Sequence, residues 1–163
     1  MTDKQVALMA HLMRRAGFGT TQEELEQRVA KGYEETVEEL LHPDTQPPWE
    51  EDLARRHHIG ARYGNGLPET QGWWLQRMIS TRRPLEEKMT LFWHSIACSG
   101  NAKVDHPQTM QKQIEMLRHH CLGNYRELLS DLARDPAMII YLDNKDNHKD
   151  AINENWGREL LEL

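Results

Sequence analysis

The sequence predicts an all-α fold, an irregular multi-helix bundle of about seven to nine helices with no significant sheet. Three observations predict it. Apolar residues recur at helical spacing in one segment after another, and Gly, Pro and capping residues separate those segments. Strand-like alternation over four or more residues is lacking, with only the MIIYL stretch at 138–142 resembling a strand.

Capping residues and glycines divide the first half of the chain into helices. An apolar stripe over 6–13 predicts the first helix, which Gly17 ends. Thr21 and Glu24 have the spacing of a capping box and open a second helix, which Gly32 ends. The further helices expected in this half are 36–41 and 50–58, with loops near 42–50 and 59–70.

The second half contains the longest apolar patterns. Pro84 suits the first turn of a helix, and Gly123 ends another. The helices expected here are about 73–79, 84–98, about 109–121, 124–135 and a last one from near 153.

Length and charge bound the class of protein. The chain has 163 residues, which suits a single all-α domain spanning 1–163 or the N-terminal portion of a larger helical domain. A net charge of −6 argues against a nucleic acid partner, because phosphate-binding faces are basic. No stretch reaches the length of a membrane span, and the N-terminus lacks the pattern of a signal peptide, so the default location is cytoplasmic.

The chain has two cysteines, Cys98 and Cys121. Both lie in apolar patterns and are expected to be buried free thiols.

Helix 84–98 is the most informative about a site. It has apolar residues on both sides, and such a helix is usually buried on both sides. Glu87 and His94 would then lie in an interior or a cleft, where a charge needs a partner. Two interpretations follow, a general base or metal ligand, and a histidine hydrogen-bonded for structural reasons.

The sequence argues against a carboxylate-bridged metal centre and against a calcium loop. Glu115 and His119 are one turn apart, but the chain has no Glu-x-x-His, which a carboxylate-bridged bundle centre needs. A calcium loop starting at Asp143 would place Lys145 and His148 where an oxygen ligand and a glycine are required. The pairs His57-His58 and His119-His120 are expected on the surface. No metal or cofactor is therefore assigned.

The last helix has a polar start. Asn153 is expected to cap it, and Glu154 and Arg158 have the spacing of an ion pair. Asn155 and Glu159 belong to a polar stripe beside an apolar one. Because the closing residues are rich in Leu and acidic at the negative end of the helix dipole, we expect the native chain to continue as helix and this chain to be a cut form.

Five blocks together resemble a bacterial family, domain of unknown function 1800, whose members are much longer than this chain. The resemblance implies a mostly helical fold and no established activity, cofactor or substrate. It also implies export for many members, which this N-terminus does not support. Members often carry Asn-His after FWH, where this chain has Ser95-Ile96, so any role of that second histidine is absent here. The blocks are HLMRRAGFG (11–19), RPLEEKMTLFWH (83–94), RHHCLGNYRELL (118–129), DPAMIIYLDN (135–144) and NENWGRELLEL (153–163).

Two functional hypotheses result. The first is an enzyme, hydrolase-like, with a polar cluster between helices as its site. The second is a non-catalytic binding or scaffolding module for a cell-envelope partner, in which the cluster is structural. A protein, or the remaining C-terminal part of the same chain, would be the partner. The candidate catalytic residues are His94, Glu87, Arg118, Asn155 and Glu159, with the 143–147 loop beside them.

Overall fold

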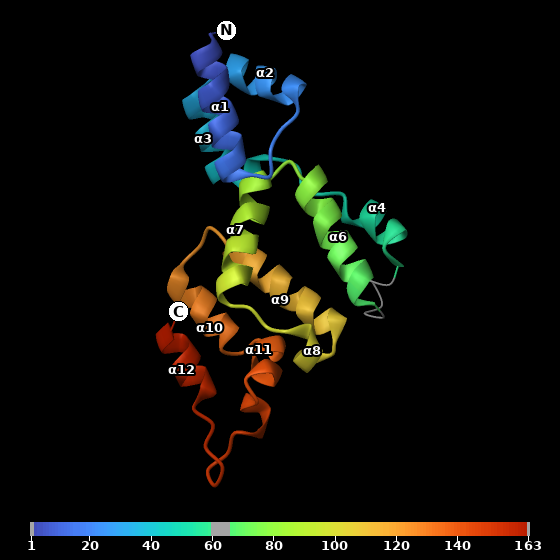
Figure 1. Ribbon diagram of the computed structural model, residues 1–163, viewed down its shortest axis with the longest axis vertical. Coiled ribbons are helices and arrows are strands. Elements are labelled where there is room, and N and C mark those ends of the chain that lie inside the picture. The colour runs from blue at the N-terminus through green and yellow to red at the C-terminus, as the bar shows by residue number, and fades with distance from the viewer. Residues whose placement is uncertain (1, 60–65, 163) are drawn as a thin grey trace.

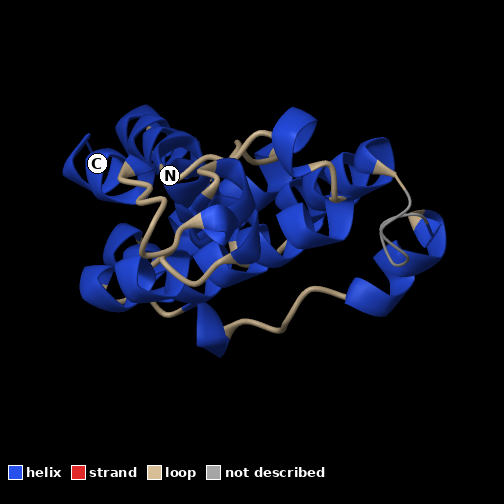
Figure 2. Cartoon of the chain, turned by 90° about the horizontal axis from the view of Figure 1, so that it is seen from below, coloured by secondary structure: helices blue, strands red, loops and turns tan. Residues whose placement is uncertain are grey.

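The computed structural model describes residues 2–59 and 66–162, and over these residues the all-α prediction is confirmed. The described residues form eleven α-helices, nine of them at least seven residues long, and no strand. Figure 2 shows helices joined by loops throughout. The helices are α1 (Asp3–Ala16), α2 (Gln22–Lys31), α3 (Tyr33–Leu41), α4 (Glu51–His57), α6 (Leu67–Ser80), α7 (Pro84–Ile96), α8 (Asn101–Val104), α9 (Pro107–His120), α10 (Tyr125–Leu132), α11 (Pro136–Tyr141) and α12 (Asn155–Glu162).

Helices α1, α2 and α3 gather at one end of the molecule (Figure 1). Thr2 and Gln5 form a complete capping box at the start of α1. At α2 the side chain of Thr21 accepts from the backbone N–H of Glu24, which confirms the predicted cap. A small apolar core of Met13, Ala16 and Leu40 joins α1 to α3, and Leu85 of α7 packs against it.

Helix α7 runs from this end into the rest of the molecule (Figure 1). It packs against α9 and α6 along its length and against α1 and α3 near its start. At Gly17, just after α1, a Cβ would lie 3.0 Å from Cβ of Pro84. The backbone at Gly17 is extended and suits any residue, so space alone limits a side chain there, and Pro84 would have to shift by a few tenths of an ångström. Helix α7 is therefore the element that connects the two parts of the fold.

Three further cores lie beyond α7, and the smallest, of Val104, Met110 and Ala137, joins α8, α9 and α11. Trp73, Trp74, Ala54 and Ile114 pack together between α4, α6 and α9. The largest core joins α9, α10 and α11, and Trp156 of α12 packs against it. Its buried members are Ala97, Leu117, Leu128, Leu132, Met138 and Leu142. Among the helices described, none combines the length and the apolar character that a bilayer-spanning segment needs.

Several expectations need correction. The MIIYL stretch is helical, because Asp135 caps α11 and Pro136 occupies its first turn. The second expected loop ends earlier than predicted, since α6 begins at Leu67, while residues 60–65 lie outside the described part. Cys98 is exposed rather than buried. Helix α7 ends at Ile96, so Cys98 does not lie on the buried face that a longer helix would have given it. Cys121 is buried as predicted.

Candidate functional site

Glu87 is the centre of a buried polar cluster between α6, α7 and α9. Its side chain is fully inaccessible to solvent. Oε1 accepts from Nε of Arg77 at 2.5 Å and from Nε of Arg118 at 2.6 Å. Oε2 accepts from Nη2 of Arg118 at 3.2 Å and from Nε1 of Trp74 at 3.0 Å. One carboxylate therefore links three helices through four hydrogen bonds. We call Glu87, Trp74, Arg77 and Arg118 the Glu87 cluster.

The local sequence explains how these side chains meet. Pro84 sits in the first turn of α7 and fixes where that helix begins, which puts Glu86 and Glu87 in the first turn. Trp74 and Arg77 are three residues apart on α6 and so share one of its faces. Glu86 extends the network outward, because it contacts Arg77 at 3.4 Å.

Arg83 connects the same network to the loop before α4. Its guanidinium lies 3.8 Å from Glu86 and donates to the backbone carbonyl of Gln46 at 2.6 Å. The loop at 46–50 is thus held against the start of α7 by a side chain whose role the sequence pattern did not indicate.

The Glu87 cluster holds one carboxylate against two guanidinium groups, and Glu86 contacts Arg77 as the second acid. Burial by itself would raise the pKa of Glu87, but the hydrogen bonds and positive charges of Arg118 and Arg77 outweigh it. The net effect holds the pKa of this carboxyl below its ordinary value, so Glu87 is ionised at neutral pH. A buried ion pair of this kind is an expensive arrangement unless every partner is satisfied, and here the carboxylate is.

His94 lies two turns after Glu87 on α7 and borders the cluster through Trp74. The two rings meet edge to face with centroids 5.1 Å apart. His94 is half-buried, and its Nδ1 is inaccessible and has no hydrogen-bond partner among the described residues. Burial lowers its pKa below 6.5 and favours the neutral imidazole. The same indole therefore donates to Glu87 and packs against His94.

Asn155 and Glu159 lie away from these groups, on α12. Asn155 donates from Nδ2 to the carbonyl of Leu142 at 3.0 Å, and Asn153 donates to the same carbonyl at 2.9 Å. Oδ1 of Asn153 accepts from the N–H of Asn155, which agrees with the predicted cap. In the described chain no hydrogen bond or ion pair joins α12 to Glu87, His94 or Arg118.

Two further side-chain arrangements near α12 differ from those predicted. The expected ion pair of Glu154 with Arg158 does not form over the described residues, because Arg158 donates to Oδ1 of Asn155 at 3.1 Å instead. The 143–147 loop turns at Asp143, which has φ of 58° and pairs with Lys103 at 2.7 Å. The high density of asparagine is explained by bonds within this loop and to Leu142, and these tie the start of α12 to the end of α11.

Two histidines that were expected on the surface form hydrogen bonds between helices. Nε2 of His58 lies 2.8 Å from Oε1 of Gln76, which joins α4 to α6. His120 is buried, and its Nε2 lies 2.8 Å from Asp131, which joins α9 to α10. Within residues 2–59 and 66–162, no three His, Cys, Asp or Glu side chains form a group able to hold a metal ion.

Ser99, Gln113 and Asp135 form a second buried network of hydrogen bonds, which the sequence pattern did not predict. Asp135 accepts from the N–H of Met138 at 2.9 Å and from Nε2 of Gln113 at 2.8 Å. Gln113 in turn accepts from the hydroxyl of Ser99 at 2.6 Å. Only the position of Asp135 before Pro136 could have signalled it, as a helix cap. These bonds satisfy the groups that they bury and position α11 against α9.

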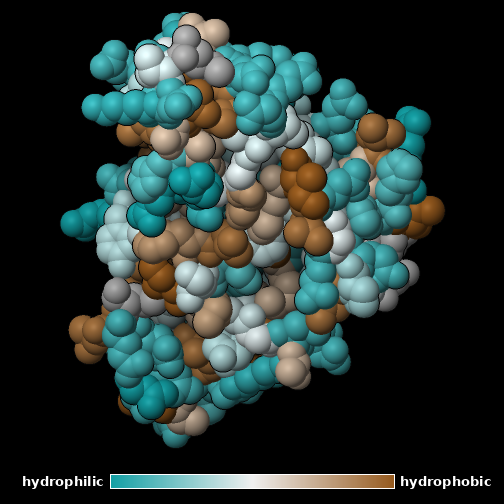
Figure 3. All heavy atoms as spheres, turned by 45° about the horizontal axis from the view of Figure 1, so that its top comes forward, coloured by the Kyte–Doolittle hydropathy of each residue, from teal (hydrophilic) through white to brown (hydrophobic). Residues whose placement is uncertain are grey.

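Four hollows on the described surface lie apart from the Glu87 cluster, and none is lined by Glu87, His94 or Arg118. The first, of about 610 Å³, runs between α2 and the end of α6, and its Arg28, Lys31 and Glu39 pair with one another. The second and third flank Trp49, and the fourth, of about 380 Å³, lies between Asp143 and Asn155. Figure 3 shows apolar side chains in the middle of one face, between hydrophilic margins.

Comparison with known proteins gives one match. A family model described as "Protein of unknown function (DUF1800)" matches residues 11–163. No curated protein and no solved structure matches the chain significantly.

Proposed function

The chain belongs to the DUF1800 family of proteins of unknown function, and from that premise we propose that it is a non-catalytic helical binding module whose Glu87 cluster is structural. The observation that carries the proposal is the state of Glu87. This carboxylate is fully buried, accepts four hydrogen bonds and is neutralised by two arginines. Following the family resemblance, the partner class we propose is a component of the cell envelope.

Burial argues against a catalytic role for the cluster. A general acid, base or nucleophile must come within hydrogen-bond reach of a substrate. Glu87 is fully inaccessible, Arg118 is only 9% exposed, and the described hollows lie elsewhere. The pKa of Glu87 is held low, whereas a carboxyl that works as a general acid near neutral pH has its pKa raised. Each of these features is the one expected of a buried structural ion pair.

His94 favours the competing enzymatic function. It is half-buried, and its lowered pKa keeps the imidazole neutral and able to accept a proton. A catalytic histidine is normally oriented by a hydrogen bond to one ring nitrogen, and Nδ1 of His94 lacks such a bond within the described residues. A hydrolase would therefore depend on His94 alone among the groups near Glu87.

One experiment separates the two functions. The purified chain, Glu87→Gln and His94→Ala are tested for turnover of chromogenic carboxyl esters, phosphate esters and glycosides, and melting is followed in parallel. A structural cluster predicts no turnover by the wild type, a strongly lowered melting temperature for Glu87→Gln and a smaller decrease for His94→Ala, which loses the contact with Trp74. Turnover that is lost in a fully folded His94→Ala variant would overturn the proposal in favour of the hydrolase.

A further inference from the structure

Helix α7 carries a second apolar face that the fold leaves open. Glu87 and Leu91 point to the side covered by α6 and α9. Met89, Phe92 and Ile96 follow one another at i, i+3 and i+7 and so form one stripe on the helix. Phe92 is 47% exposed and Ile96 36%. The stripe therefore has the spacing of a helix-packing surface, and the described chain covers it only in part.

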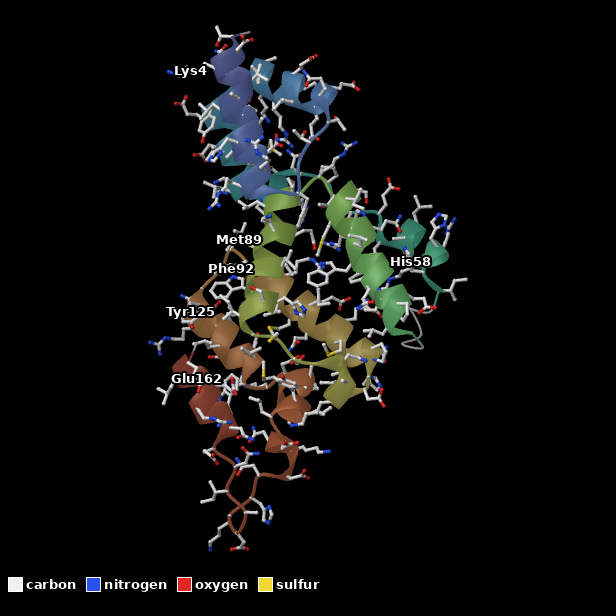
Figure 4. The ribbon with its side chains drawn as sticks, viewed as in Figure 1. Lys4, His58, Met89, Phe92, Tyr125 and Glu162 are labelled. Atoms are coloured by element: carbon white, nitrogen blue, oxygen red, sulfur yellow. The ribbon has the colours of Figure 1, made fainter. Side chains whose placement is uncertain are left out.

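Aromatic contacts extend this stripe onto α10. The rings of Phe92 and Trp93 meet edge to face with centroids 5.1 Å apart, and Trp93 stacks on Tyr125 at 5.6 Å. The indole of Trp93 is fixed by donating to the carbonyl of Cys121 at 3.1 Å, while Tyr125 is 48% exposed. Figure 4 shows Met89, Phe92 and Tyr125 along the same edge of the molecule. We call Met89, Phe92, Ile96 and Tyr125 the aromatic ridge.

Two cations flank the aromatic ridge. Lys88 precedes Met89, and its Nζ lies 5.0 Å from the ring centroid of Phe18, an aromatic side chain that is 42% exposed. Arg126 follows Tyr125 in the first turn of α10. Over the described residues neither Lys88 nor Arg126 takes part in an ion pair, although most of the half-buried arginines of this chain do. The ridge thus offers apolar area with two adjoining cations that form no ion pair over the described residues, while Glu127 lies in the same first turn of α10 as Arg126.

We propose that the aromatic ridge docks an acidic amphipathic helix of a protein partner. This inference rests on the proposed binding function and names its surface and the chemistry of its ligand. A helix that is apolar on two sides is generally covered on both. Apolar residues at i, i+3 and i+7 fit the grooves of a second helix, and an amphipathic helix laid on such a surface is a recurrent mode of recognition. Acidic residues along the partner's margin would pair with Lys88 and Arg126.

Charge argues for this occupant over two others. A second copy of the chain, joined about a two-fold axis, would bring the same basic margins together. An anionic membrane surface would attract the two cations but repel a chain of net charge −6. A partner helix places its acids only along its margins, so they pair locally with Lys88 and Arg126, whereas a bilayer presents negative charge to the whole facing side of the chain.

The test begins with a displayed library of helical peptides selected on the immobilised wild-type chain. We expect the selected peptides to combine leucine-type residues at i, i+3 and i+7 with an excess of Asp and Glu. Their affinities are then measured by fluorescence anisotropy for Phe92→Ala and Lys88→Glu. Phe92→Ala should weaken binding at least tenfold, as expected for a central aromatic contact. Lys88→Glu should weaken it several-fold, and changing the facing Glu of the peptide to Lys should restore binding to that variant.

Matched controls lie elsewhere on the molecule. Ile79 of α6 is 75% exposed, and Lys4 of α1 lies far from the ridge in Figure 4. Ile79→Ala and Lys4→Glu should bind the selected peptides as the wild type does. Lys4, Ile79 and Phe92 are exposed and Lys88 is half-buried, and unchanged melting temperatures establish that each variant is folded.

Three results would overturn the inference. The library could yield no binding peptide, or the selected peptides could lack an excess of Asp and Glu. Alternatively, Phe92→Ala and Ile79→Ala could lower the peptide affinity equally. Sedimentation of the chain with phosphatidylglycerol vesicles that Phe92→Ala abolishes would assign the ridge to a membrane. A wild-type dimer that Phe92→Ala dissociates would assign it to a second copy. These results differ from the one that would contradict the proposed function, which is enzymatic turnover that is lost in His94→Ala.

Discussion

Glu87 and Arg118 are 31 residues apart in the sequence and form a two-point ion pair across α7 and α9, with Nε to Oε1 at 2.6 Å and Nη2 to Oε2 at 3.2 Å. Both side chains are buried, and Arg77 of α6 binds the same carboxylate. The pair therefore fixes the relative placement of three helices by geometry that apolar contacts alone do not specify. Replacement of either partner leaves the other charged and buried.

The first prediction concerns the Glu87 carboxylate. Glu87→Gln should lower the free energy of unfolding by about 3–5 kcal/mol, because the buried Arg118 loses its counter-charge and the half-buried Arg77 keeps only Glu86. Urea unfolding followed by tryptophan fluorescence measures the change. Glu23→Gln is the control, an exposed acid outside any ion pair of the described chain, and it should change stability by no more than about 0.5 kcal/mol. Equal effects of the two substitutions would show that the pair does not stabilise the fold.

The second prediction concerns His94 and pH. Its pKa is lowered by burial from the ordinary value of 6.5, so the unfolded chain takes up this proton first as the pH falls. The stability contributed by His94 is therefore present above about pH 6.5 and is lost as the pH falls through the folded-state pKa. Glu87 acts in a lower window, because its pKa is held below 4.5 and its contribution is lost only as the pH falls through that folded-state value.

His94→Gln, which carries no titrating group, should flatten the pH dependence of the unfolding free energy below pH 6.5. The measurement is a series of urea titrations from pH 7.5 to about pH 5, chosen to bracket the ordinary histidine pKa. His11→Gln on the exposed side of α1 should keep the wild-type slope. An unaltered slope in His94→Gln would mean that the imidazole is not desolvated in the folded state.

The third prediction concerns the two thiols. Burial raises the pKa of Cys121 to about 11, with the charge of Glu86 acting in the same direction, so little thiolate forms at pH 8. Cys98 is exposed beyond the end of α7. A thiol reagent at pH 8 should modify one cysteine rapidly and the second only on unfolding. Cys98→Ser should remove the rapid phase and Cys121→Ser should keep it, whereas two rapid thiols would contradict the packing around Cys121.

The fourth prediction concerns the cap of α11. Burial raises the pKa of Asp135, although the N–H groups of Met138 and Ala137 and the amide of Gln113 partly oppose that effect. For an acid with a raised pKa, the stabilising contribution is present below the unfolded value of 3.8 and is lost as the pH rises through the folded-state pKa. An uncharged acceptor at this position should therefore serve the fold at neutral pH.

Asp135→Asn keeps an oxygen that can accept from Met138 and Gln113, and it should change the unfolding free energy by less than about 1 kcal/mol. Asp135→Ala removes both acceptors and the cap, and it should cost about 2–3 kcal/mol. Thermal unfolding of the two variants at pH 7 tests the order. An Asn variant as unstable as the Ala variant would show that the charge, rather than the acceptor, is required.

The sequence predicted the helices best where end signals and apolar period agreed. Pro84 begins a helix with a clear apolar face and Gly32 ends another, as predicted, whereas α9 begins at Pro107, two residues before its predicted start. The MIIYL stretch resembles a strand because isoleucine and tyrosine favour strands, yet it is helical as far as Tyr141 because Asp135 caps the helix and Pro136 opens it. Local propensity was outweighed there by a specific terminal signal.

The candidate site was predictable only in part, for a geometric reason. Glu87 and Arg118 could be found because each is a polar residue among buried positions of its own helix. Trp74 and Arg77 could not, because their contact with Glu87 depends on the angle between α6 and α7. Asn155 was misplaced because its partner is the carbonyl of Leu142, and a backbone acceptor leaves no mark in the sequence.

The close approach of Gly17 to Pro84 has a consequence for how the chain opens. Helices α1, α2 and α3 contact the rest of the molecule chiefly through the beginning of α7. A methyl group at position 17 would lie 3.0 Å from Cβ of Pro84 and push this contact apart. In Gly17→Ala, amide hydrogen exchange should then accelerate together across α1–α3 while α9 keeps its protection. That pattern would identify the three amino-terminal helices as one cooperative unit, able to detach before the molecule as a whole unfolds.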